Sequence, residues 1–318
     1  MLTRWSAVLA EVVLATLLTV GCFSAGIFFP VLGAMLTLLC PLPLAALAMR
    51  RGRPTFLAAL LLAPLLLGIL GSRWQAAGFV LEFVAPAVIL AEALRRGRRS
   101  EGITLAVAFW LSLGGLAVLL LGAGQWDQPL QAVRQHLDVL LRDVEGMTTR
   151  LGLAEGPEAA AASAAQARQW LLMAFPGLFF AGNVLAAAGY DATLRWLARR
   201  RPAAFGGIVP APWLWQLPEH LVRVFIAAGA LYLSGLHRLE TMGLNGLIAL
   251  LSLYFLQGVS VVLFWIHRFQ LPRFLVAVSV VMLMLQPLAM LLVAGVGLFD
   301  VWCAFRRPTL PNSPRGVS

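Results

Sequence analysis

The feature that most constrains this chain is a series of long apolar stretches separated by short clusters of arginine. Hydrophobic residues make up 60% of the 318 residues and charged residues only 12%, whereas about 25% of the residues in soluble domains are charged. The mean hydropathy is +0.86. A chain of this composition cannot bury its apolar surface away from water, so lipid must be its solvent. The sequence therefore predicts an all-α, polytopic transmembrane helical bundle.

The apolar stretches are close to the roughly 20 residues that a helix needs to cross a bilayer, and they predict about 8–10 membrane segments. The expected segments lie near residues 5–20, 31–49, 54–71, 76–94, 102–123, 169–192, 219–236, 242–267 and 272–304. Several contain proline or clustered glycine. Such interruptions are tolerated at membrane depth where protein covers the freed backbone groups, so some segments are expected to be broken or re-entrant.

The stretch 125–167 is the only long departure from hydrophobicity. From Leu130 to Leu151, apolar residues recur every three or four positions, which predicts one amphipathic helix followed by an alanine-rich link. The helix carries as many acids as bases, so it lacks the basic face of a helix drawn to anionic lipid. It is expected to cover the bundle, with a gate or a partner-docking surface as alternatives. The predicted domains are an N-terminal bundle (1–124), this extracytoplasmic helix and link (125–167) and a C-terminal bundle with a cytoplasmic tail (168–318).

The basic residues predict the orientation. All 24 are arginine and the net charge is +10. Placing the N-terminus, the tail and the loops at 50–53, 95–99, 195–201 and 268–273 in the cytoplasm, and counting Arg223 with them, leaves only six arginines outside it. This distribution follows the positive-inside rule and predicts a multi-pass membrane protein with a cytoplasmic N-terminus. The basic excess is thus a topology signal and does not indicate nucleic acid as a partner.

The end of the chain conflicts with this orientation. Nine single crossings from a cytoplasmic N-terminus would leave the C-terminal arginines outside. The last apolar stretch is long and Gln286-Pro287 interrupts its centre, so it is expected to form two short or re-entrant halves that return the tail to the cytoplasm. A miscounted first reversal, near residues 21–30, is the alternative.

Charged residues within the apolar stretches are candidates for a site, because a charge at mid-membrane costs about 2.5–3.5 kcal/mol on insertion scales. Glu11 and Glu82 lie deepest and are predicted to bind a ligand or a proton, with a plain interhelical hydrogen bond as the alternative. Glu92 and Asp191 lie within a turn or two of arginine clusters. These two are expected to form salt bridges near the cytoplasmic face.

Amide residues suggest a second grouping. Gln257, together with Asn183 and Gln286, is predicted to form a polar cluster near the membrane midplane that binds a ligand. Hydrogen bonds that only join helices, worth roughly 0.6 kcal/mol each, are the alternative. Asp300 and Arg306 are predicted to act as a structural latch that fixes the C-terminus against the membrane.

Signatures of enzymes are missing from the sequence. There is no lysine, which excludes a Schiff-base lysine and a P-loop. The three cysteines form no CxxC pair, and the four histidines have no metal-ligand spacing. The chain is therefore expected to have neither catalytic activity nor a metal or cofactor.

A family resemblance rests on a series of short motifs in order: Pro41-Leu42-Pro43, Arg51-Gly52, Asn245, Tyr254-Phe255-Leu256-Gln257-Gly258, Gly297-Leu298-Phe299-Asp300 and Arg306. Over nearly the whole chain these motifs resemble the YybS-like family of predicted bacterial membrane proteins of unknown function. That family is distantly similar to the substrate-binding subunits of energy-coupling-factor vitamin transporters and to the membrane partner of the rod-shape machinery. The resemblance implies a transport-type, small-molecule-binding subunit that works with membrane or ATPase partner subunits. A non-catalytic scaffold that recruits an envelope or cytoplasmic partner is the alternative.

Overall fold

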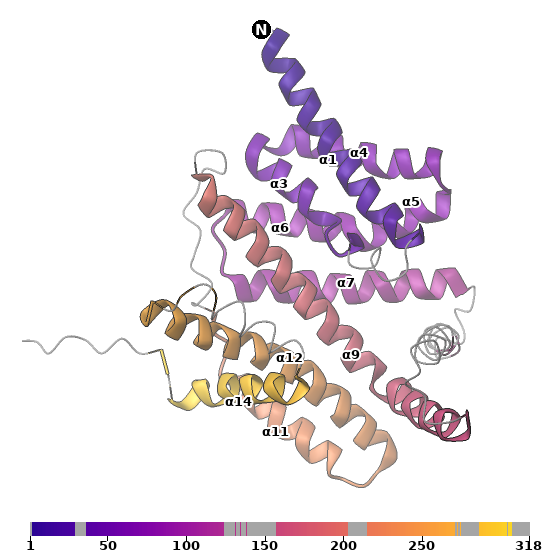
Figure 1. Cartoon of the computed structure of the whole chain (residues 1–318), viewed down its shortest axis with the longest axis vertical. Coiled ribbons are helices and arrows are strands. Elements are labelled where there is room, and N and C mark those ends of the chain that lie inside the picture. The colour runs from indigo at the N-terminus through magenta and orange to yellow at the C-terminus, as the bar shows by residue number, and fades with distance from the viewer. Residues whose placement is uncertain are drawn as a thin grey trace, which may run out of the picture.

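The structure, a computed structural model, describes residues 2–28, 36–123, 131, 134, 138, 157–202, 215–270, 272, 274, 286–303, 305 and 306. Every regular element in these residues is helical, which confirms the predicted fold class (Figure 1). The elements are α1 (Leu2–Phe28), α3 (Pro41–Arg51), α4 (Arg53–Leu70), α5 (Arg73–Phe79), the π-helical turn η1 (Val80–Val84), α6 (Ala85–Arg95), α7 (Ser100–Ala123), α9 (Pro157–Arg200), α11 (His220–Tyr232), α12 (His237–Arg268) and α14 (Pro287–Cys303). Most of the expected amphipathic helix lies outside the described residues.

Six segments of the described chain are long and apolar enough to cross a membrane by length and composition. They are Ser6–Gly26, Arg53–Leu70, Arg73–Arg95, Ser100–Leu121, Ala165–Arg200 and His237–Arg268. Helices α5 and α6, joined by η1, form one of these segments. Helices α11 and α14 are apolar but shorter, with 13 and 17 residues. The protein is therefore a multi-pass membrane protein in which full-length helices alternate with short ones.

Helix α3 is shorter than both α11 and α14. Its 11 residues extend about 16 Å, roughly half of the hydrocarbon core of a bilayer. Prolines occupy its first turn, where a missing N–H removes no helical hydrogen bond. Just before the helix, the Cys40 thiol donates a hydrogen bond to the Thr19 carbonyl of α1 over 3.4 Å. The expected proline kink within a span at 31–49 is thus the beginning of a half-length helix packed on α1.

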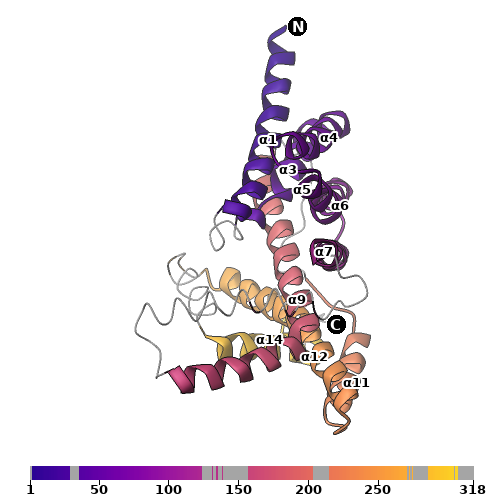
Figure 2. The same cartoon turned by 90° about the vertical axis from the view of Figure 1, so that its right-hand side faces the viewer.

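Helix α9, with 44 residues, joins the two halves of the molecule. It packs against α7 on one side and α12 on the other, and it crosses between the N-terminal helices and the group of α11, α12 and α14 (Figure 1). The beginning of α9 is turned away from the rest of the helix (Figure 2). One hydrophobic cluster runs through α3, α6, α7, α9, α11 and α12, and a second is centred on α1, α3 and α4.

A side chain from α12 enters the backbone of α9 next to Pro176. In a regular helix the Gly177 N–H pairs with the Met173 carbonyl. Here the Asn245 carboxamide contacts both groups: its Oδ1 accepts from Gly177 N over 2.6 Å and its Nδ2 donates to Met173 O over 2.8 Å. Asn245 therefore satisfies polar backbone groups in the turn that a proline disturbs, and it fixes α12 to α9 at that level.

Helices α12 and α14 run in the same direction. Figure 1 shows this direction, and beyond α14 the Arg306 side chain contacts Ser260 in the last third of α12. The end of α14 therefore lies at the same end of the molecule as the end of α12 (Figure 1). This is the arrangement expected if the last apolar stretch consists of two halves. The first half, near residues 275–285, lies outside the described residues.

Two glycines permit the close contact of α12 with α14. A Cβ on Gly258 would collide with the Val293 carbonyl, and a Cβ on Gly297 would collide with the Tyr254 carbonyl. Small residues allow membrane helices to approach closely enough for dispersion contacts between their backbones. This approach also brings Asp300 within reach of α12.

We expect Gly297→Ala to lower the free energy of unfolding by about 1–3 kcal/mol, because the new methyl group overpacks the contact with α12. Gly295→Ala in the same helix is the matched control, since a Cβ there meets nothing within 4 Å. Unfolding of the purified protein in detergent micelles measures both. Equal stability of the two variants would contradict the close α12–α14 contact.

Candidate functional site

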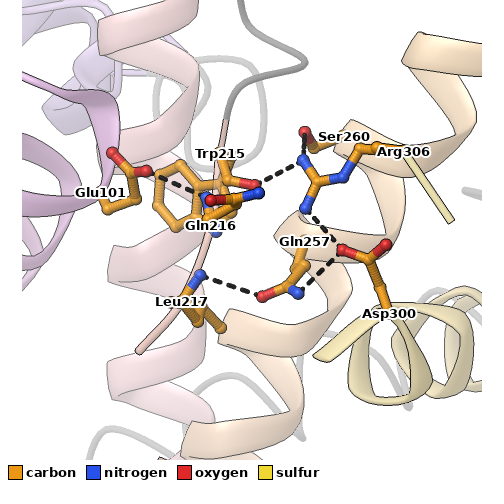
Figure 3. Close-up of polar contacts among 8 residues, drawn as sticks. All are labelled: Glu101, Trp215, Gln216, Leu217, Gln257, Ser260, Asp300 and Arg306. Atoms are coloured by element: carbon orange, nitrogen blue, oxygen red, sulfur yellow. Dashed lines mark hydrogen bonds and ion pairs between the residues drawn. The ribbon is translucent and has the colours of Figure 1, made fainter. Parts of the chain in front are cut away.

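The candidate site is a buried polar network around the extended segment Trp215–Pro218, which precedes α11 (Figure 3). A residue before proline is disfavoured in the helical conformation, which helps to keep this segment extended. An extended segment without a neighbouring strand must find other partners for its backbone groups. Here those partners are side chains from three different parts of the chain.

Three successive residues of the segment are held in this way. The Trp215 carbonyl accepts a hydrogen bond from Arg306 Nη1 over 2.6 Å. The Gln216 N–H donates to Glu101 Oε1 of α7 over 2.9 Å, and the Leu217 N–H donates to Gln257 Oε1 of α12 over 3.1 Å. The segment therefore connects α7, α12 and the residues that follow α14.

The second part of the network is a buried ion pair. Arg306 Nη2 lies 2.5 Å from Asp300 Oδ2, and their side chains are 8% and 5% exposed. Gln257 Nε2 donates to the same carboxylate oxygen over 3.1 Å, and Arg306 Nη1 also donates to Ser260 Oγ over 2.9 Å. A buried ion pair is tolerated when further hydrogen bonds satisfy its polar atoms. Asp300 and Arg306 are thus paired, and their role as a latch that fixes the C-terminus against the membrane stays a prediction.

Three buried polar atoms near this network have no hydrogen-bond partner within the part of the chain that the structure describes. They are Asp300 Oδ1, the indole Nε1 of Trp215 and the hydroxyl of Tyr254. Tyr254 lies one helical turn before Gln257. An unsatisfied buried polar group costs about 1–3 kcal/mol, so such groups are rare without a functional reason. Asp300 Oδ1 is a hydrogen-bond acceptor, Trp215 Nε1 is a donor, and the Tyr254 hydroxyl can act as either.

The expected cluster of Gln257 with Asn183 and Gln286 is not formed. Asn183 Nδ2 donates to Ser112 Oγ between α9 and α7 over 3.1 Å, and Gln286 is exposed just before α14. Gln257 contacts Asp300 instead, because α14 runs parallel to α12 and brings Asp300 to the same level. The sequence analysis assigned Gln257 to a midplane cluster and Asp300 to a latch at the C-terminus, but the two side chains are in direct contact.

Glu11 also lies in different surroundings from those expected. Its carboxylate pairs with Arg51 over 2.7 Å and with Arg50 over 3.4 Å, at the end of α3. Glu11 thus belongs to the arginine-rich end of the bundle, since α3 ends beside its turn of α1. Its role in binding a ligand stays a prediction.

Glu82 lies in the π-helical turn η1 and is partly buried. No hydrogen bond or ion pair links it to another described residue, and a Cβ on Gly115 of α7 would lie 3.7 Å from its Oε1. The neighbouring Leu81 carbonyl accepts a hydrogen bond from Trp110 Nε1 over 3.0 Å. π-helical turns often occur at functional sites, and the predicted ligand or proton role of Glu82 stays open to test.

The salt bridges expected near the arginine clusters are present. Glu92 pairs with Arg53 over 2.7 Å and with Arg96 over 2.8 Å. Asp191 pairs with Arg195 over 2.8 Å, in a contact that is almost completely buried. Opposite charges four residues apart on one helix face are a signal that the sequence carries directly.

Two contributors to the site were not foreseen. Glu101 and Trp215 enter through contacts with backbone groups, which no residue pattern encodes. The only available signal was the Gln-Leu-Pro sequence after Trp215, which favours an extended segment. Among the described residues, no three histidine, cysteine, aspartate or glutamate side chains are grouped so that they could hold a metal ion.

Comparison with known families matches residues 16–301 to the family described as Predicted membrane protein (DUF2232). No curated protein and no solved structure matches the chain. The expectation of a family of predicted membrane proteins covering nearly the whole chain is thus confirmed. The more specific likeness to YybS-like proteins and to energy-coupling-factor subunits stays a prediction.

We expect Arg306→Met to lower the free energy of unfolding by about 3–5 kcal/mol, because it leaves the Asp300 carboxylate buried without its counter-ion. The double variant Asp300→Asn/Arg306→Met should lose less, since no buried charge remains. Arg53→Met, which breaks an exposed pair with Glu92, should cost less than about 1 kcal/mol. Unfolding in detergent micelles measures all three, and additive losses in the double variant would show that the pair is not coupled.

Proposed function

The chain belongs to the DUF2232 family of predicted membrane proteins, and from this premise we propose that it is a transport-type membrane subunit that binds a small polar solute. The solute binds beside the segment Trp215–Pro218, between α12 and α14. The observation that carries the proposal is that three buried polar atoms of residues in or beside the network, namely Asp300 Oδ1, Trp215 Nε1 and the Tyr254 hydroxyl, have no hydrogen-bond partner among the described residues.

The interrupted helices support this proposal. In many secondary transporters the solute site is formed by broken helices and by irregular backbone that lines a cavity inside the protein. Here the extended segment leads into the 13-residue helix α11, and α14 has only 17 residues. Carbonyl and N–H groups at such breaks are available to a ligand as well as to side chains.

The need for partner subunits follows from the sequence. The chain has no nucleotide-binding motif, so ATP-driven transport requires ATPase subunits from other chains. This is the division of labour in energy-coupling-factor transporters, whose substrate-binding subunits the chain distantly resembles through YybS-like proteins. Because fold-level likeness alone carries little functional weight, the proposal rests on the site.

The alternative function is a scaffold that recruits an envelope or cytoplasmic partner. The link between α6 and α7 favours it, because Arg96, Arg98 and Arg99 are all exposed there. An exposed basic link of this kind can attract an acidic protein surface. The scaffold needs no solute, and this difference separates the two functions experimentally.

The solute site predicts a specific effect of Tyr254→Phe. This change removes one hydroxyl that makes no hydrogen bond to a described residue, so the stability of the free protein should not fall. If the hydroxyl binds the solute, the affinity should decrease about three- to tenfold, as expected for one neutral hydrogen bond. A thermal-unfolding screen of the detergent-purified protein with vitamins, nucleobases and amino acids identifies a solute, and calorimetry then measures its affinity.

Tyr190→Phe is the matched control. The Tyr190 hydroxyl is also buried and has no hydrogen-bond partner among the described residues, but it belongs to α9. Binding should be the same in this variant as in the wild type. The proposal fails if no compound raises the unfolding temperature or if the two tyrosine variants bind equally.

Cross-linking in native membranes should capture ATPase subunits; a stoichiometric partner of another kind, without solute binding, would establish the scaffold.

We also propose that the protein resides in the bacterial inner membrane with its N-terminus in the cytoplasm. The turn between α11 and α12 then faces outward, while the α6–α7 link faces the cytoplasm. In a chain without its native cysteines, a membrane-impermeant maleimide should label Ser234→Cys in intact cells and should label Arg99→Cys only after permeabilisation. The reverse pattern would invert the orientation.

A further inference from the structure

A second feature, separate from the solute site, is a cavity of 340 Å³ between the beginning of α4 and the end of α6. Its inner wall contains the buried side chains of Phe56 and Ala91. Its outer wall contains Leu57 and Val88, which are exposed and lie within membrane-spanning segments. The cavity is therefore apolar inside and borders on the lipid-facing surface of both helices.

Four charged residues also border this cavity, but its lining surface is almost entirely apolar, so their charged ends lie at its rim. Arg53, Arg95 and Arg96 contribute three positive charges and Glu92 contributes one negative charge, which leaves a net charge of +2. Glu92 pairs with Arg53 and Arg96 and holds these two guanidinium groups close together. Arg95 forms no ion pair with any residue that the structure describes. The cavity thus combines a basic cluster with an apolar wall that opens to lipid.

This combination fits one class of ligand. We infer that the cavity binds one anionic phospholipid molecule, with its phosphate at Arg53, Arg95 and Arg96 and an acyl chain along α4. Guanidinium groups bind phosphate oxygens through directed, often paired hydrogen bonds. Basic pockets between transmembrane helices are known sites for anionic lipid headgroups. The net positive charge favours an anionic lipid over a zwitterionic one.

The surface of α4 continues the path of the acyl chain. Leu57, Leu61 and Leu65 are spaced four residues apart, so they lie along one face of the helix. They are 52%, 71% and 57% exposed. This apolar strip begins at the cavity and leads away from the arginines. A free phosphate ion would use the arginines alone, whereas a phospholipid also uses the strip.

The lipid site predicts a charge-specific loss of binding in Arg95→Gln. Removing one arginine near an anionic headgroup should weaken the affinity for phosphatidylglycerol about fivefold. Arg200→Gln is the matched control, because Arg200 stacks on Trp196 at the end of α9 and is not part of the cavity. Native mass spectrometry of the full-length protein, titrated with phosphatidylglycerol or phosphatidylcholine, measures both affinities.

Wild-type protein and Arg200→Gln should bind phosphatidylglycerol alike and more tightly than phosphatidylcholine. Leu57→Asn should also weaken lipid binding, because it places an amide in the apolar wall without changing the charge. Equal binding of both lipids, or equal affinity of Arg95→Gln and Arg200→Gln, would overturn the proposal. Displacement of the lipid by excess inorganic phosphate, with no effect of Leu57→Asn, would replace it with a site for a free anion. The solute-binding experiment is independent of all these outcomes.

Discussion

The buried ion pair between Asp300 and Arg306 is the interaction on which the arrangement of the C-terminal helices depends. An unpaired charge buried in this position would cost several kcal/mol, so Asp300 must lie where the chain after α14 can bring the Arg306 side chain into contact with it. The chain achieves this because α14 ends at Cys303, only three residues before the arginine. Gln257 binds the same carboxylate oxygen, which fixes the level of α14 against α12. The glycine contacts of these two helices then supply the close approach that the short hydrogen bonds require.

Hydrogen bonds connect this ion pair to the segment Trp215–Pro218 and, through that segment, to α7. Arg306 holds the Trp215 carbonyl, Gln257 holds the Leu217 N–H, and Glu101 holds the N–H between them. The segment therefore cannot move without breaking contacts with several elements at once. The indole Nε1 of Trp215 in this segment and the hydroxyl of Tyr254 in α12 are both buried, and no described protein group satisfies them. A rigid frame with uncommitted donors is what a solute site requires.

The sequence predicted the helices and the local ion pairs because both depend on short-range patterns. Apolar runs define membrane segments whatever their neighbours are, and Asp191 and Arg195 are four residues apart on one helix. It could not predict the partner of Gln257, since that partner depends on the direction of α14 relative to α12. The surroundings of Glu11 were also predicted incorrectly. Because α3 has only 11 residues, the arginines at its end lie beside Glu11 of α1, whereas a full-length span would have ended farther along α1. A side-chain contact with a backbone group, such as that of Glu101, cannot be predicted from residue types, because every residue has a backbone.

Two buried sites use arginine in the same way, and lysine could not replace it in either. Arg195 binds Asp191 in its own helix and donates to the carbonyl of Arg98 in the α6–α7 link over 2.9 Å. Arg306 likewise binds Asp300 and donates to the carbonyl of Trp215. In each case one planar guanidinium neutralises a buried carboxylate and, with another of its nitrogens, binds the backbone of a neighbouring non-helical segment. A lysine ammonium is a compact point charge on a flexible stem and lacks this fixed fork of donors. Arginine therefore serves here to attach non-helical segments to helices.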